Sequence, residues 1–295
     1  MISNEWPDLP RFFPPRGDVS PRTGRPAMSD ARRIAMWLGD WLLGGGRLAF
    51  LTDYDGTLTP IVPSPEEAEL ADEVRRDLEA LARSPQIDVA VVSGRDLADV
   101  RARVGVNGLI YGGCHGLEIE GKGLRFLHAD AQAQEETLAA IGRQLAERAQ
   151  AVPGMQIEPK RFGVAVHYRH VAREEVGRVE TELARAIQQV GSRFKIFHGS
   201  QVIEVQPQVG WNKGDGVRWI RDELQRASTA PLMALYMGDD WTDEHAFEAL
   251  AGQGITVRIG DLVPATKATY WLPGVDDAQR LLAALATRAV ATPRP

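Results

Sequence analysis

Two aspartates, Asp53 and Asp55, come directly after a short apolar run at residues 48–52. An apolar run of this length, stopped at once by Gly56, is typical of a buried strand. Residues i and i+2 of an extended chain point to the same side, so both carboxylates are expected to emerge together at the carboxyl end of the strand. Because like charges repel, the pair favours a divalent cation, an acid/base pair, or both. The alternative is a simple turn, in which Asp and Gly are common.

Strand and helix patterns alternate on both sides of an irregular middle. Apolar runs are followed by helical patterns between residues 48 and 111, and again from residue 213 to the C-terminus. This order predicts an α/β fold with a doubly wound parallel sheet. In the middle, hairpin patterns and two long helical patterns replace the alternation, which predicts an inserted α+β lid.

We therefore divide the chain into three parts. Residues 1–45 are expected to be an N-terminal extension, a Pro-, Arg- and Gly-rich tail followed by a helix, with Met28 as an alternative start. Residues 46–117 and 209–295 are expected to form the core of the protein. Residues 118–208 are expected to form the lid.

Charge and composition argue against several classes of protein. The formal net charge is −6, from 34 basic and 40 acidic residues, and without a dense basic run this argues against binding to nucleic acid. The single cysteine, Cys114, excludes an internal disulfide and a cysteine zinc cluster, and it agrees with a reduced, cytoplasmic location. No apolar stretch approaches the roughly 18 residues of a membrane span. We therefore expect no association with a membrane.

Three of the predicted strands end in polar side chains. Besides the first pair of aspartates, Ser93 and Arg95 follow the second strand, and Asp239 and Asp240 follow the strand at 232–237. The carboxyl ends of parallel strands meet at one edge of the sheet, where open α/β sheets bind their ligands. Four acids, a hydroxyl and nearby cations at one edge predict a site for a phosphate and a metal ion. Taken singly, each residue also has a structural explanation, such as a helix cap for Ser93.

Four motifs at these positions resemble, in order and spacing, those of the haloacid dehalogenase superfamily. They are DYDGTLTP at 53–60, SGR at 93–95, Lys213 and GDDWTDEHAF at 238–247. Within that superfamily the chain is similar to trehalose-6-phosphate phosphatases. The strings that carry this similarity are GGCHGLE at 112–118, EPKRFGVAVHYR at 158–169, IEVQP at 203–207, GWNKG at 210–214 and GDDWTDE at 238–244. The resemblance covers about residues 46–285.

The resemblance implies a reaction that passes through an aspartyl-phosphate. Asp53 would attack phosphorus. Asp55 would protonate the leaving sugar oxygen and then deprotonate the attacking water. Ser93 would donate a hydrogen bond to a phosphoryl oxygen, and Lys213 would balance negative charge. These four residues are the expected catalytic group.

The metal implied by the resemblance is Mg²⁺, a hard cation that prefers oxygen ligands and phosphate. Its ligands would be Asp53, the backbone carbonyl of Asp55, and Asp239. Asp240 and Asp243 would bind the ion directly or support the residues that do.

Substrate contacts are expected from the core and from the lid. The expected contacts in the core are Gly56, Thr57, Arg95, His115 and Asp243. Those that the resemblance implies in the lid are Glu158, Lys160, Arg169 and Glu204. Carboxylates accept hydrogen bonds from sugar hydroxyls, and cations bind a phosphate. The alternative for the lid residues is that they are charges on a solvated strand.

The implied function is Mg²⁺-dependent hydrolysis of trehalose 6-phosphate to trehalose and phosphate, the last step of trehalose biosynthesis. One alternative keeps the chemistry and changes the sugar, to sucrose phosphate or a glycosyl phosphoglycerate. Another is a non-catalytic regulatory module that binds a sugar phosphate or a synthase. A two-metal nuclease fits poorly with the acidic surface. A trehalose-phosphate synthase is the suggested protein partner, and we expect a monomer.

Overall fold

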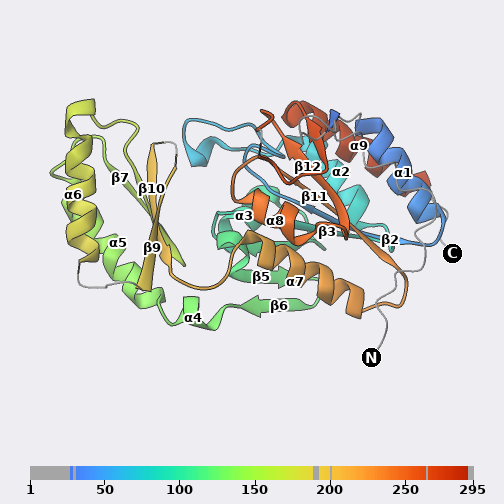
Figure 1. Cartoon of the computed structure of the whole chain (residues 1–295), viewed down its shortest axis with the longest axis horizontal. Helices are drawn as coiled ribbons and strands as arrows, with labels where there is room; N and C mark the ends of the chain where they lie inside the picture. The colour runs from blue at the N-terminus through green and yellow to red at the C-terminus, as the bar shows by residue number, and fades with distance from the viewer. Residues whose placement is uncertain (1–26, 29–30, 189–192, 200, 264, 292–295) are drawn as a thin grey trace.

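The strands of the protein form two sheets, which a computed structural model describes for residues 27–28, 31–188, 193–199, 201–263 and 265–291 (Figure 1). The larger sheet has nine strands. Their order is β1 (Ala27–Met28), β13 (Tyr270–Leu272), β12 (Gly254–Ile259), β11 (Leu232–Gly238), β2 (Arg47–Thr52), β3 (Ile87–Val92), β4 (Ile110–Gly113), β5 (Glu118–Gly121) and β6 (Leu124–Leu127). Neighbours from β1 to β4 are parallel, and the last two pairs are antiparallel.

Helices cover both faces of the nine-stranded sheet. One face is covered by α1 (Ala31–Leu43), α2 (Asp72–Ala82), α3 (Leu97–Val104) and α9 (Val275–Ala291), and the other by α7 (Lys213–Arg226) and α8 (Asp243–Ala249). On β2, Leu48 and Phe50 pack with the first group, whereas Ala49 and Leu51 pack with the second. Burial on both faces is typical of a central parallel strand. The predicted doubly wound α/β fold is confirmed.

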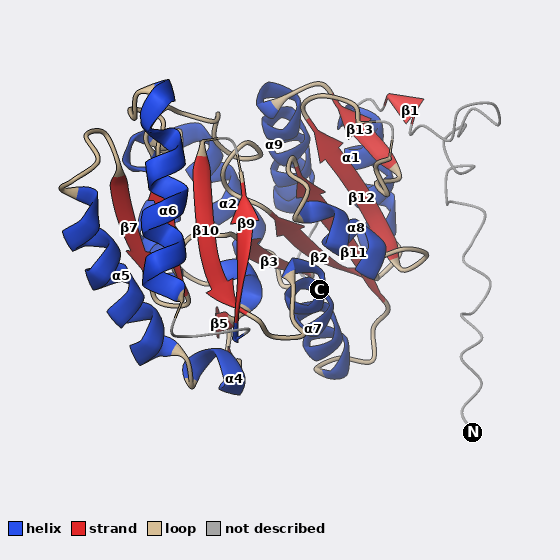
Figure 2. Cartoon of the chain, turned by 60° about the vertical axis from the view of Figure 1, so that its left-hand side comes forward, coloured by secondary structure: helices blue, strands red, loops and turns tan. Residues whose placement is uncertain are grey.

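The second sheet is antiparallel and lies within the middle of the chain. Its order is β7 (Gln156–Lys160), β8 (Gly163–His167), β10 (Val202–Pro207) and β9 (Phe194–His198). Helices α5 (Glu135–Ala149) and α6 (Val176–Ile187) cover its outer face, and the opposite face is turned toward the nine-stranded sheet (Figures 1 and 2). We call this sheet with its two helices the lid. The remaining short helices are α4 (Ala129–Gln132), η1 (Pro65–Glu67), η2 (Cys114–Gly116) and η3 (Arg173–Glu175).

The hairpin β5–β6 corrects one expectation. Residues 118–127 were expected to begin the lid, but β5 pairs with β4, with Ile119 opposite Gly112, and so extends the nine-stranded sheet. The connection through η2 is short, and a short connection returns a strand antiparallel to its neighbour. A hairpin pattern does not reveal which sheet the hairpin joins, so the start of the lid at residue 118 was placed too early.

Two strands were not predicted. β7 contains Pro159, which argues against a central strand, and the structure places β7 at the edge of the lid sheet, where proline is tolerated. β1 has only two residues and pairs with β13. The expected tail at residues 1–27 lies almost entirely outside the described residues. No helix in the described ranges combines the length and the apolar character needed to cross a bilayer.

We expect Phe50→Ala to lower the free energy of unfolding by about 3–5 kcal/mol, because Phe50 is fully buried between β2 and its covering helices. Urea denaturation followed by circular dichroism measures this change. Leu43→Ala is the control, since Leu43 is 66% exposed, and it should change stability by less than about 0.5 kcal/mol. Equal losses for the two variants would contradict the assignment of β2 as a central strand.

Candidate active site

Three neighbouring strands bring the predicted polar residues to one edge. β11, β2 and β3 lie side by side and are parallel, with Thr52 opposite both Met237 and Val91. The residues that follow each strand therefore emerge together. Asp53 follows the central strand of the three, and its backbone N–H donates to Met237 O at 2.9 Å. Ser93 follows β3 and is buried.

Lys213 lies between two carboxylates. Its Nζ is 2.7 Å from Asp53 Oδ1 and 2.6 Å from Asp243 Oδ1, and all three side chains are buried. The Tyr236 hydroxyl also donates to Asp243 Oδ1 at 2.6 Å, and the backbone N–H of Asp240 donates to Asp243 Oδ2 at 2.9 Å. Asp243 thus has a donor on each oxygen, so its clearest task is to hold Lys213 against Asp53.

The start of α7 sets the position of this lysine. The Asn212 side chain accepts hydrogen bonds from the backbone N–H groups of Gly214 at 2.8 Å and Asp215 at 3.3 Å, and the Asn212 backbone N–H donates to Asp215 Oδ2 at 2.9 Å. Reciprocal capping of this kind fixes where a helix begins. A Cβ on Gly214 would lie 2.2 Å from His245 O, so glycine lets α7 approach α8 closely.

Two glycines allow the acidic loops to pack together. Gly56 has φ +76°, and a Cβ there would lie 2.1 Å from Asp239 Oδ2. A Cβ on Gly238 would lie 2.2 Å from Asp243 Cγ. The Thr57 hydroxyl donates to Asp239 Oδ1 at 3.2 Å. Thr57 therefore holds an acid of the site, and its predicted contact with substrate stays a prediction.

Three acids of this site can share a cation. Asp53, Asp239 and Asp243 each offer a carboxylate oxygen, and these oxygens lie within 4.8 Å of one another. Burial raises the pKa of Asp53 well above its ordinary value; Lys213 opposes this shift, and the other two acids add to it. Burial and Asp243 raise the pKa of Asp239 to about 7. Three carboxylates facing one lysine leave excess negative charge, which a divalent cation would offset.

Oxygen donors of this kind fit a hard divalent cation. Lys213 contacts Oδ1 of Asp53, and Thr57 contacts Oδ1 of Asp239, whereas both oxygens of Asp243 accept hydrogen bonds. Asp53 and Asp239 are therefore better placed to bind an ion than Asp243 is. Within the described part of the chain, Asp240 does not belong to the converging group, and it is exposed. Its role as a metal ligand stays a prediction, as does that of the Asp55 carbonyl.

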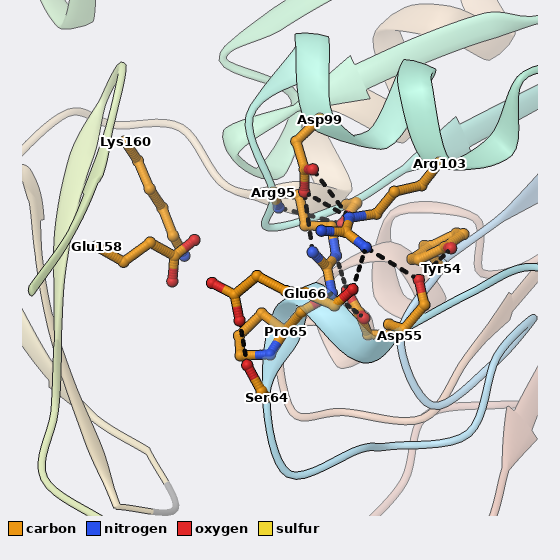
Figure 3. A network of polar contacts seen from close by, with 12 residues as sticks. Tyr54, Asp55, Ser64, Pro65, Glu66, Arg95, Asp99, Arg103, Glu158 and Lys160 are labelled. Atoms are coloured by element: carbon orange, nitrogen blue, oxygen red, sulfur yellow. Dashed lines mark hydrogen bonds and ion pairs between the residues drawn. The ribbon is translucent and has the colours of Figure 1, made fainter. Parts of the chain in front are cut away.

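Asp55 is held by a bidentate ion pair with Arg95 (Figure 3). Arg95 Nε lies 2.7 Å from Asp55 Oδ2, and Nη2 lies 2.7 Å from Oδ1. Arg95 also donates to Asp99 Oδ2 at 2.9 Å and to Pro65 O at 2.8 Å, while Arg103 binds Asp99 from the other side at 2.9 Å. Bidentate pairs fix orientation. Arg95 was predicted to contact substrate, and that stays a prediction. Its observed side-chain hydrogen bonds go to two acids and one backbone carbonyl of the core, which local sequence patterns do not reveal.

His115 occupies a strained loop beside Ser93. His115 has φ +60° and follows Cys114 with φ +47°, which is uncommon for residues other than glycine. Its backbone N–H donates to Ser93 O at 2.8 Å, and its ring lies over Gly94, where a Cβ would be 2.8 Å from Cε1. Burial and the charge of Lys213 lower its pKa to about 4, so the imidazole is neutral near pH 7. Its buried Nδ1 has no partner among the described residues.

A cavity of about 470 Å³ lies between the two sheets. Residues of the core that line it include His115, Lys213, Asp240, Trp241 and His245. Residues of the lid that line it include Lys195, Phe197, Glu204 and Gln206. Because Lys213 also contacts Asp53, the cavity reaches the side chain that neutralises the acidic site.

Two of the four lid residues predicted to bind substrate form one pair. Lys160 Nζ lies 2.7 Å from Glu204 Oε1. Burial alone would raise the pKa of Glu204, but Lys160 and His115 bring it down to about 2. Burial by itself would lower the pKa of Lys160; Glu204 and Glu158 raise it instead. Both side chains lie close to the imidazole of His115.

The other two lid residues lie elsewhere. Glu158 Oε2 is 2.9 Å from His167 Nε2, and Arg169 donates to Gln201 Oε1 at 3.0 Å and to Pro63 O at 2.8 Å. Both residues line a separate cavity of about 570 Å³ between the lid and the loop that precedes η1. The structure therefore does not bring all four predicted lid residues into one cavity.

The lid also contacts the loop after β3. The backbone N–H of Arg161, between β7 and β8, donates to both carboxylate oxygens of Asp96 at 2.9 and 3.1 Å. The Arg161 side chain pairs with Glu118 and with Glu135. Cys114 Sγ lies 3.0 Å from Asp96 Oδ1. Asp96 thus links the lid to the strained loop that carries His115.

Known proteins are similar to this chain in sequence. A family model described as trehalose-phosphatase matches residues 51–271. The trehalose-phosphate phosphatase of Mycobacterium tuberculosis (strain H37Rv) is 39% identical over 269 residues, which are 90% of this chain and 67% of that protein.

Two solved structures show the same fold. The C-terminal domain of a C. albicans trehalose-6-phosphate phosphatase has a TM-score of 0.70 at 24% identity, over 90% of this chain and 99% of that one. The C-terminal domain of the Candida albicans trehalose synthase regulatory protein has a TM-score of 0.62 at 16% identity, over 89% and 99% of the two chains. The fold alone therefore does not separate enzyme from regulator. The matched residues run from before Asp53 to beyond Asp243, and the chain belongs to the trehalose-phosphatase family.

Proposed function

We propose that this protein is a phosphatase that hydrolyses trehalose 6-phosphate to trehalose and phosphate, the last step of trehalose biosynthesis. The observation that carries the proposal is the buried Asp53 paired with Lys213, at the edge of a cavity that the lid covers. Family membership supports the substrate class, a sugar phosphate. A cytoplasmic location, a monomeric state and an association with a trehalose-phosphate synthase stay predictions.

Asp53 is the proposed nucleophile. One of its carboxylate oxygens attacks phosphorus, the bond from phosphorus to the sugar oxygen breaks, and an aspartyl-phosphate forms. Asp55 gives its proton to the leaving sugar oxygen. Asp55 then takes a proton from a water molecule, which attacks phosphorus, releases phosphate and restores Asp53. Lys213 keeps Asp53 ionised during attack because its ammonium group lies 2.7 Å away.

The ion pair with Arg95 limits what Asp55 can do in the resting structure. Both oxygens of Asp55 accept hydrogen bonds from the guanidinium group, although the side chain is 39% exposed. For proton transfer, one of these oxygens has to leave the guanidinium and take up a proton from solvent, because a carboxylate that accepts hydrogen bonds on both oxygens has no proton to give. Arg95 therefore acts as a positioning residue that determines where Asp55 points. Ser93, which precedes Gly94 and Arg95 in the chain, is the proposed donor to a phosphoryl oxygen.

Mg²⁺ is the proposed metal. Asp53 and Asp239 would hold it, with Asp243 in support through Lys213. The ion would supply positive charge that offsets the phosphoryl oxygens and the acidic cluster. The crowding of these carboxylates, which raises the pKa of Asp239, is the observation that favours a cation here.

A second candidate function is a regulatory module that binds a sugar phosphate without turnover. The shared fold of the Candida albicans regulatory protein favours keeping it. The presence of the five expected catalytic and metal-binding residues argues for catalysis instead: Asp53, Asp55, Ser93, Lys213 and Asp239. Phosphate release with Mg²⁺ from a panel of trehalose 6-phosphate, sucrose phosphate and a glycosyl phosphoglycerate separates these functions. Tight binding without turnover would support the regulatory module, and equal rates on all three would remove trehalose as the preferred sugar.

Asp53→Asn should lower phosphate release by at least about 10³-fold, because the amide is a far weaker nucleophile than the carboxylate. Phosphate release is measured at saturating Mg²⁺, and circular dichroism checks that the fold is kept. Asp130→Asn, which changes an exposed acid in α4, is the control and should keep near-normal activity. Near-normal activity of Asp53→Asn would exclude Asp53 as the nucleophile.

Asp239→Asn should raise the melting temperature of the metal-free protein at pH 8. The pKa of Asp239 is raised to about 7 in the fold against 3.8 ordinarily, so its charge destabilises the fold increasingly as pH rises from about 4 to about 7. Differential scanning fluorimetry measures this, with and without Mg²⁺. The same substitution should remove most of the stabilisation that Mg²⁺ provides to the wild type at pH 8.

Asp240→Asn is the matched control, since it neutralises the adjacent, exposed acid. It should keep the stabilisation by Mg²⁺. If Asp240→Asn loses that stabilisation and Asp239→Asn keeps it, the ligand assignment is reversed.

Glu204→Gln should lower kcat/KM for trehalose 6-phosphate by about 10–100-fold, because a charged acceptor for sugar hydroxyls is lost. The loss on p-nitrophenyl phosphate, which has no sugar, should be several times smaller. Glutamine keeps the size of the side chain and a partner for Lys160, which limits damage to the lid. Equal losses on both substrates would move Glu204 out of substrate recognition.

A further inference from the structure

Lys195 belongs to the face of the lid that is turned toward the core. It lies on β9 opposite Gln206 of β10, and Phe197 lies opposite Glu204. Side chains alternate along a strand, so Lys195 and Phe197 share one face, whereas Phe194 packs into the lid interior. Lys195, Phe197, Glu204 and Gln206 all line the 470 Å³ cavity.

The environment of Lys195 differs from that of the other lysine on this face. Lys160 is bound to Glu204 at 2.7 Å. The Nζ of Lys195 lies 4.9 Å from the ring centre of Phe197, and no carboxylate in the described part of the chain forms an ion pair with it. Burial lowers its pKa. A half-buried ammonium group without an acidic partner is stabilised when a ligand brings hydrogen-bond acceptors to it.

Two aromatic rings extend this part of the cavity wall. Phe197 from the lid and Trp241 from the loop after β11 have ring centres 5.3 Å apart at 35°. The ring of His245 in α8 also lies next to Trp241, with ring centres 5.8 Å apart. Trp241 is 47% exposed. Aromatic faces in a ligand pocket bind apolar surface, and a pyranose ring presents such surface through its C–H bonds.

We propose that Lys195, Phe197 and Trp241 form a sugar-binding wall that determines substrate specificity. Lys195 donates hydrogen bonds to hydroxyl oxygens of the sugar, and the two rings contact its C–H face. With the phosphate near Lys213, the body of a disaccharide phosphate extends along the face of the lid that Glu204 shares with this wall. The inference rests on the proposed function and adds residues to it that accept the part of the substrate remote from phosphorus.

Turnover of two substrates tests the role of Lys195. Lys195→Met keeps the length of the side chain and removes its donors, so KM for trehalose 6-phosphate should rise by about tenfold or more. The rise for p-nitrophenyl phosphate should be several times smaller, and Lys195→Arg should restore most of the affinity for the sugar phosphate. Lys267→Met is the charge-matched control, because Lys267 pairs with Glu248 and does not line the cavity.

Binding of trehalose tests the two rings without any turnover. Phe197→Ala and Trp241→Ala should each raise the Kd for trehalose, measured by isothermal titration calorimetry, by about 3- to 10-fold. Ile196→Ala is the control on the same strand, since Ile196 points to the opposite face and is 40% exposed. Lys195→Met should weaken trehalose binding in the same assay.

The outcomes separate this inference from the proposed function. A wild-type protein that releases no phosphate from any sugar phosphate overturns the proposed function, while trehalose binding that depends on Lys195 and the rings still supports the wall. Normal turnover of trehalose 6-phosphate, with KM and trehalose binding unchanged in Lys195→Met and Phe197→Ala, overturns the wall alone. Equal rises in KM on both substrates overturn it as well.

Discussion

The site depends on the position of one buried ammonium group. Lys213 contacts Asp53 and Asp243 at hydrogen-bond distance in a region with little solvent, where an unpaired charge would be costly. The helix cap at Asn212, the hydroxyl of Tyr236 and the absence of a side chain at Gly238 all serve to keep this arrangement. The loop after β2, the start of α7, the end of β11 and the start of α8 therefore all have to be in place before Asp53 acquires its environment.

Division of labour between the acids follows from the same geometry. Asp243 is saturated with donors and supports the lysine, Asp239 is crowded against Gly56, and Asp55 is turned toward Arg95. Carboxylates of one residue type thus have different tasks because each has different partners. The lid adds a polar face on which Lys160 and Glu204 offset each other's charge. Recognition of a neutral, hydroxyl-rich sugar suits such a surface better than recognition of a second anion does.

Sequence patterns predicted what local chemistry determines. α7 begins at Lys213 as predicted, since a capping residue precedes a clear helical pattern, and the acids after β2 and β11 emerge at one edge because parallel strands must do so. Contacts between distant segments were beyond reach. The pairing of Asp55 with Arg95 joins residues 40 positions apart. The hairpin at 118–127 pairs with β4 of the larger sheet, because the connection between them is short. The edge strand β7 was not predicted because it contains Pro159. A proline lacks the N–H that pairs with a neighbouring strand, but an edge strand has no neighbour on one side, so proline is tolerated there.

The link between Arg161 and Asp96 has a kinetic consequence. Asp96 is adjacent in sequence to Arg95, which orients Asp55, and its carboxylate holds the backbone of the lid between β7 and β8. Opening of the lid to release product would break those bonds. It would also disturb the loop after β3, whose Arg95 orients the proposed proton donor Asp55. Lid opening and loss of the Asp55 orientation would then be coupled. The open form could not begin another cycle until the lid had closed and the bonds between Arg161 and Asp96 had formed again.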